Sequence, residues 1–241
     1  MPFGSGAGGT QRKQTKTDGG GTFSFQGMTG RTLGIGLEKE GYEYGGGQGP
    51  FQYTEMVGEA ERFHPDRSKP VVFHMWKLQG PEPLAEGNRN FRLPHDEASV
   101  RIDMRSAKTV AEGGDLEIVL RCEQLKPGES RKFNWSVDVS GVNGGGVIDA
   151  GQKITAMFAA PADGYQASLK IETDANAKDW NGDAQPSFYL RTAAGNFAKV
   201  WADFHPNPQD ATGYVTLRWW FNPKVGSRVL EPKQTEQALN P

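Results

Sequence analysis

Apolar residues alternate with polar ones along most of the chain, and this pattern restricts the fold more than any other feature. In residues 213–221, every second residue from Val215 to Phe221 is apolar, and residues 116–122 and 133–139 show the same spacing. A side-chain period of two is typical of a half-buried β-strand, because successive residues of a strand point to opposite sides. Further segments with strand character lie at residues 22–26, 32–38, 70–77, 100–105, 153–159, 187–192 and 196–204. The pattern therefore predicts many strands and almost no helix.

Turn signals separate these segments. Asp-Gly at 18–19, Lys-Pro-Gly at 126–128 and Asn-Gly-Asp at 181–183 are examples, and the 241 residues include 32 glycines and 15 prolines. Many short strands joined by Gly- and Pro-containing turns are typical of an all-β sandwich or barrel. We therefore expect an all-β fold.

Charge and composition exclude several classes of protein. Lys plus Arg is 27 and Asp plus Glu is 29, so the net charge is −2, which argues against a nucleic-acid-binding protein. No stretch of about 18 apolar residues is present, so we expect no membrane-spanning helix. The single cysteine, Cys122, cannot form an internal disulfide.

Residues 17–43 carry a motif that resembles a known family. Thr17, Asp18, Gly21, Phe23, Phe25, Leu33, Ile35, Leu37, Gly41 and Tyr42 match the turn, strand and turn of the carboxypeptidase regulatory-like domain, a transthyretin-like β-sandwich. We expect Asp18 and the glycines to form a tight turn, Phe23 and Phe25 to point into a core, and Gly41 to take a positive φ. The family is an accessory domain beside some carboxypeptidases, so the resemblance implies no peptidase activity.

The opening strand of that family has no counterpart in residues 1–16. The resemblance therefore implies a partial transthyretin-like sandwich at 17–78, followed by a second β-sandwich or jelly-roll-like domain at 95–231. We assign residues 1–16 to a flexible lead-in, 79–94 to a linker and 232–241 to a polar tail. We expect the chain to be a piece of a longer exported protein; the alternative is a cytoplasmic protein with a disordered start.

Several C-terminal segments are similar to a companion region of bacterial envelope proteins that carry this domain. The matching segments are 144–146, 160–165, 188–190, 222–223, 226–228 and 230–231. The resemblance implies an extracellular or periplasmic protein without catalysis, whose partners are other envelope proteins or glycans. Because strands of the first sandwich are missing, we also expect edge-strand pairing with another chain.

Catalytic and metal-binding patterns are not recognisable in the sequence. The four histidines, at 64, 74, 95 and 205, lack the close spacing of metal ligands, and no G-x-S-x-G segment is present. Cys122 closes an apolar strand face, so we interpret it as a structural thiol rather than a nucleophile. Residues 174–183 are rich in oxygen ligands but depart from the EF-hand pattern, so a polar surface loop is favoured over a Ca²⁺-ordered one. We expect no catalytic residues, no metal and no cofactor.

Aromatic residues provide the candidate binding site. Trp220 shares one face of its strand with Tyr214, Thr216 and Arg218, and Trp180 lies in a polar loop. A flat aromatic ring with a neighbouring donor can stack on the apolar face of a sugar. Two hypotheses remain open: a structural or interaction module, and a carbohydrate-binding module that uses Trp220, Tyr214, Arg218 and Trp180. In the first, Trp220 packs against a second sheet or another domain.

Overall fold

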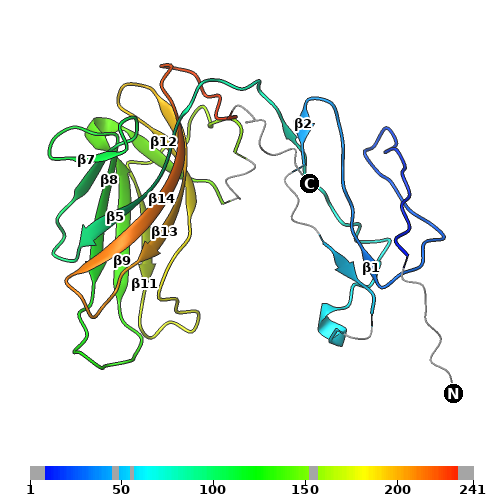
Figure 1. Cartoon of the computed structure of the whole chain (residues 1–241), viewed down its shortest axis with the longest axis horizontal. Coiled ribbons are helices and arrows are strands. Elements are labelled where there is room, and N and C mark those ends of the chain that lie inside the picture. The colour runs from blue at the N-terminus through cyan, green and yellow to red at the C-terminus, as the bar shows by residue number, and fades with distance from the viewer. Residues whose placement is uncertain (1–8, 45–48, 55–56, 152–156, 233–241) are drawn as a thin grey trace. The chain divides into compact units, whose positions relative to one another are not determined.

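The computed structural model describes residues 9–44, 49–54, 57–151 and 157–232 (Figure 1). It is all-β, as predicted, and within the described residues the helical elements are two short 3₁₀ turns. The chain divides into two compact units. The smaller contains described parts of residues 1–38 and 46–74, and the larger contains those of 39–45 and 75–241.

Two five-stranded sheets form the larger unit. The strands are β5 (Ala85–Pro94), β6 (Val100–Asp103), β7 (Lys108–Val110), β8 (Leu116–Cys122), β9 (Trp135–Gly141), β10 (Gly146–Asp149), β11 (Ser168–Thr173), β12 (Ser187–Arg191), β13 (Phe197–His205) and β14 (Thr212–Asn222), with a 3₁₀ turn, η2 (Val142–Gly144), before β10. One sheet has the order β10-β12-β13-β14-β5 and the other β11-β9-β8-β6-β7. All neighbouring strands are antiparallel.

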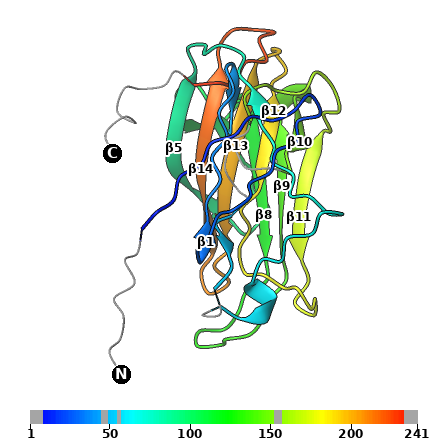
Figure 2. The same ribbon diagram turned by 90° about the vertical axis from the view of Figure 1, so that its right-hand side faces the viewer.

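The core lies between these two sheets, which face each other as the layers of a sandwich (Figure 2). Val215, Leu217 and Trp219 of β14 are fully buried there, and Phe221 is 2% exposed. They belong to the same core cluster as Ile118 and Val137 of the other sheet. The period of two predicted this inward face. Burial of such side chains stabilises the fold by roughly 2 kcal/mol each.

Trp219 links the two sheets by a hydrogen bond. Its indole Nε1–H donates to the carbonyl oxygen of Met104, 2.8 Å away, so the one polar atom of this buried ring is satisfied. The ring extends over Gly87 on the neighbouring strand β5, the residue paired with it in register.

Strand β5 lies inside residues 79–94, for which the sequence predicts a linker, so that prediction is wrong. Phe91 and Leu93 point into the core, but the preceding inward positions hold Gly87 and Arg89. The apolar alternation is therefore too short to stand out in the sequence. β5 is the end strand of its sheet and pairs with β14 over its whole length.

Two glutamates tie the segment that enters the sandwich to the segment that leaves it. The Glu82 carboxylate accepts hydrogen bonds from Asn222 Nδ2 at 2.8 Å and Ser227 Oγ at 2.7 Å, and pairs with Lys224 Nζ at 3.0 Å. Glu231 Oε2 accepts the backbone N–H groups of residues 79 and 80, at 2.7 and 3.0 Å. We call these contacts the glutamate clamp.

The short strands outside the sandwich have two residues each. They are β1 (Thr32–Leu33) paired with β3 (Phe51–Gln52), and β2 (Tyr42–Glu43) paired with β4 (Trp76–Lys77); η1 spans Glu59–Glu61. The smaller unit has an aromatic cluster instead of a large sheet. Rings of Phe23, Phe25, Phe51, Phe63 and Phe73 contact one another in pairs, at centroid distances of 4.6 to 6.3 Å.

The turn expected at Asp18 is present. Asp18 Oδ1 accepts the N–H groups of Gly20 and Thr22, at 2.9 and 2.8 Å, and Gly21 has a φ of 78°. Gly41 has the expected positive φ, 72°. These local features agree with the predicted turns, and the transthyretin-like resemblance remains a prediction. Most of the candidate strand at 153–159, most of the tail and half of the lead-in lie outside the described residues.

Candidate binding face

The sheet that contains β13 and β14 has one face toward the core and one away from it. Cross-strand pairs on the outward side are Lys199 with Trp220, Trp201 with Arg218, Asp203 with Thr216, and His205 with Tyr214. Three of the four predicted site residues, Trp220, Tyr214 and Arg218, therefore lie on this outward face together. It divides into a covered end and an open end.

At the covered end, two chain segments form a second small core on the sheet. Residues 157–160 and 228–230 are joined by backbone hydrogen bonds, including Leu230 N–H to Phe158 O at 2.9 Å. Met157, Ala160 and Leu230 from these segments pack on Tyr189 and Phe197 of the sheet. This end of the face is therefore internal to the larger unit.

Trp220 lies at the boundary of the covered end. Only 9% of its surface is exposed, and two cations lie over its ring: Lys199 Nζ is 4.9 Å and Arg218 Cζ is 4.7 Å from the ring centroid. Such cation–π contacts hold the indole in place. They leave little of the Trp220 ring for a ligand, so its position favours a packing role over sugar stacking.

Lys199 is a buried amine with an unusual environment. It is 3% exposed, and its Nζ also lies 5.5 Å from the Phe158 ring centroid. Within the described residues it has no ion pair. Burial lowers the pKa of Lys199 to about 8, although the charges of Glu86 and Glu231 act in the opposite direction.

At the open end, aromatic rings and polar groups are held in fixed positions. The His205 imidazole stacks on the Tyr214 ring, with centroids 4.6 Å apart and planes at 21°. His205 Nε2 lies 3.0 Å from Asp203 Oδ2, and Gln185 Nε2 donates to Asp203 Oδ1 at 3.1 Å. Tyr214 is 43% exposed, so one large aromatic side chain is accessible here.

Trp201 and Arg218 complete the open end. Trp201 is half-buried, and its register partner Arg218 is exposed. We call Trp201, Asp203, His205, Tyr214 and Arg218 the open face. It combines flat apolar surface with hydrogen-bond donors and acceptors whose positions are set by the strands, which is an arrangement suited to a ligand with both apolar faces and hydroxyl groups.

Sequence reasoning missed the β13 members of this face. Ala198, Val200, Ala202 and Phe204 are fully buried. This alternation of apolar residues is visible in the sequence. It predicts that the odd-numbered residues of β13, which include Trp201, Asp203 and His205, lie on the outward side of the sheet.

Trp180 belongs to a different part of the molecule. Its Nε1–H donates to the Phe133 carbonyl oxygen at 2.9 Å, and the two rings meet edge to face at 5.4 Å. It packs against the main core rather than on the outward face of the sheet. Trp180 is therefore not brought together with the other three predicted site residues.

The residues considered for catalysis or metal binding are also placed. Cys122 is half-buried, and burial raises the pKa of its thiol to about 12. In loop 174–183, Asp174 Oδ1 accepts the N–H of Asn176 at 2.7 Å, which is a local turn contact.

Among the described residues, no three or more His, Cys, Asp or Glu side chains lie close enough to form a metal site. None of the helical turns described has the length or hydropathy of a membrane span.

Comparison with known proteins gives no family assignment. No protein-family model matches the chain, and no curated protein matches it. Among solved structures, the crystal structure of an apo HmuY analogue from Tannerella forsythia aligns with 60% of this chain and 99% of its own. The sequence identity is 12% and the TM-score is 0.35.

Proposed function

We propose that this chain is a non-catalytic binding module, and that its open face binds carbohydrate. The observation that supports the proposal is the stacked pair of Tyr214 and His205, on a sheet surface that also carries Trp201 and fixed polar groups. A sugar ring has an apolar face that fits an aromatic ring, and hydroxyl groups that fit planar donors and acceptors.

The polar groups of the open face match this ligand class. Asp203 is held by His205 and Gln185. Its register partner Thr216, which borders the open face, donates its Oγ–H to Asn90 Oδ1 at 2.7 Å. These side chains are already held by hydrogen bonds in the free protein. Ligand binding therefore costs less side-chain conformational entropy. Arg218 adds an exposed cation that can contact ring oxygens or an acidic sugar.

The setting that we propose for the module is outside the cell or in the periplasm, as part of a larger bacterial envelope or secreted protein. This part of the proposal rests on the resemblance of residues 17–43 to the carboxypeptidase regulatory-like domain, and of C-terminal segments to a companion region of bacterial envelope proteins that carry that domain. Its partners there are glycans or other envelope proteins.

A glycan-array and polysaccharide pull-down screen of the whole chain tests the proposal. Tyr214→Ala and Trp201→Ala each remove flat surface from the open face, and we expect each to weaken glycan binding about tenfold or more. Trp220→Ala should affect binding less, because that ring is covered. Lys170→Ala, on the outward side of the opposite sheet, is the matched control and should bind as the parent does.

Two results would overturn the carbohydrate assignment. One is that no glycan binds the parent chain. The other is that glycans bind but Tyr214→Ala and Trp201→Ala, shown to be folded by their thermal melts, retain parental affinity.

A further inference from the structure

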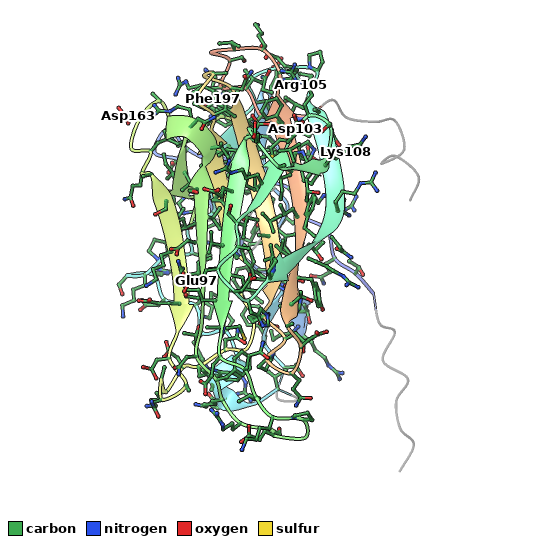
Figure 3. The ribbon with its side chains drawn as sticks, turned by 90° about the vertical axis from the view of Figure 1, so that its left-hand side faces the viewer. Glu97, Asp103, Arg105, Lys108, Asp163 and Phe197 are labelled. Carbon is green, nitrogen blue, oxygen red and sulfur yellow. The ribbon has the colours of Figure 1, made fainter. Side chains whose placement is uncertain are left out.

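The sandwich has a groove along one edge. Here β5 and β7 are the end strands of their respective sheets, and an opening of about 810 Å³ lies between them. It is lined by residues 89–94 without Leu93, residues 99–101 and residues 106–110. Figure 3 labels Lys108 on β7, with Arg105 nearby in the turn between β6 and β7.

The groove is basic. Arg89, Arg92, Arg101 and Lys108 line it, and within the described chain no Asp or Glu does. Arg101 is paired with Glu117, with 2.8 Å between Nε and Oε1. Arg89, Arg92 and Lys108 are exposed and make no ion pair with any described residue. An uncompensated set of cations in a concave site attracts anions.

Arg89 has an unusual position for a cation. It occupies an inward-facing position of β5, between Gly87 and Phe91, and it is exposed because the sandwich is open at this edge. Arg89 is thus one of the residues that line the groove.

The backbone of β5 is also available. In the described structure β5 pairs on one side only, with β14, and no other segment pairs with its second edge. The free edge is ten residues long. Such an edge carries a row of backbone N–H and C=O groups that can pair with an added strand.

We propose that this groove binds an extended acidic peptide segment, which adds to the free edge of β5 as a further strand. Backbone pairing supplies affinity, and alternate side chains of the added strand point into the groove. Carboxylates at those alternate positions would meet Arg89 and Lys108. The groove borders the open face, because Asn90 and Arg92 line it and pair in register with Thr216 and Tyr214, but the proposal does not rest on the proposed carbohydrate binding.

An inward-facing charge on an edge strand has a second known effect: it discourages self-association through that edge. The two roles of Arg89 make different predictions. If Arg89 only blocks the edge, its replacement increases self-association and changes no peptide affinity. If it recognises carboxylates, its replacement weakens binding of an acidic peptide to the monomer.

The test uses the whole chain and a fluorescent eight-residue peptide of alternating glutamate and valine, followed by anisotropy. Arg89→Glu and Lys108→Glu should each weaken its binding about tenfold. Lys170→Glu makes the same charge change on another surface and should leave the affinity within about twofold of the parent. Thermal melts confirm that each variant is folded, and bound peptide should protect the backbone amides of β5 from hydrogen exchange.

Three control measurements separate strand addition from simple charge attraction, from glycan binding and from self-association. A peptide with the same glutamates but proline in place of valine cannot pair as a strand, and equal binding of it would overturn the proposal in favour of charge attraction alone. Binding of a sulfated oligosaccharide but not of the peptide would also overturn it, as would no peptide binding at low salt. If light scattering shows parent dimers that the acidic peptide does not dissociate, the edge is occupied by a second copy and the proposal is wrong.

Discussion

The indole of Trp219 occupies the space that a side chain at Gly87 would need. A Cβ added to Gly87 would lie 2.0 Å from Cζ2 of Trp219, far inside any real contact distance. The ring cannot move away easily, because it is fully buried and donates its Nε1–H to Met104. Gly87 is therefore a packing requirement of the core.

We accordingly expect Gly87→Ala to lower the free energy of unfolding by about 3 kcal/mol, because the core must shift to accept a methyl group. Urea denaturation measures the change. Asn88→Ala, the exposed neighbour on the same strand, should stay within about 0.5 kcal/mol of the parent. Trp219→Leu combined with Gly87→Ala should cost less than the sum of the two single changes, and strict additivity would contradict the contact.

Lys199→Met should stabilise the chain at pH 7, by about 2 kcal/mol, because the parent buries an ammonium group without an ion pair in the described structure. The pKa of Lys199 is about 8 in the folded chain, below its ordinary value of 10.5. Between pH 8 and pH 10.5 the unfolded parent binds more protons than the folded parent, so its free energy of unfolding increases as the pH rises. The advantage of the Met variant should therefore shrink between pH 7 and pH 10 in paired denaturation curves.

An advantage that is constant over this pH range would show that the Lys199 ammonium is not destabilised by burial. Parent and variant share every other titratable group, so the comparison of the two removes the contribution of those groups.

Glu82→Gln should lower the melting temperature at pH 7. Hydrogen bonds from Asn222, Ser227 and Lys224 hold the pKa of Glu82 at about 2, below its ordinary value of 4.5. A lowered carboxyl pKa contributes stability above about pH 4.5 that is lost as pH falls toward 2. The parent should therefore lose more stability than the variant on acidification over that range, and parallel melting curves from pH 7 to pH 2 would rule out the contribution.

Alkylation of Cys122 by iodoacetamide at pH 8 should be slow in the folded chain. A pKa of about 12 leaves the thiol almost wholly protonated, and the thiolate is the reactive form. We expect labelling to be about 100-fold slower than in the denatured chain, where the thiol takes its ordinary pKa of about 8.5. Mass spectrometry follows the reaction, and rapid labelling of the folded chain would instead support a reactive cysteine.

Strand β14 shows what the sequence could predict. Val215, Leu217, Trp219 and Phe221 alternate over a long segment, so the strand, its core face and the outward position of Tyr214 all follow from a period of two. The same reasoning applied to β13 predicts that Trp201 and His205 lie on the outward side of the sheet, beside Arg218 and Tyr214. Strand β5 was missed because its inward positions include Gly87 and Arg89, whose roles depend on Trp219 and on an open sandwich edge.

The environment of Trp220 could not be predicted. Its strand position requires only that it point away from Trp219. It is buried beneath the cations of Lys199 and Arg218, and Lys199 comes from the neighbouring strand β13. Trp180 likewise resembled a surface aromatic until its contact with Phe133 was known. Burial by segments distant in sequence leaves no periodic signal.

The glutamate clamp also determines how the sandwich responds to mechanical tension. Residues 79–82 and 222–231 are joined by hydrogen bonds to Glu82 and Glu231, so the two chain segments are attached at one place. A force that pulls residue 80 away from residue 231 acts first on these bonds. While they hold, the load passes directly from one segment to the other, and the ten strands between them remain unstretched.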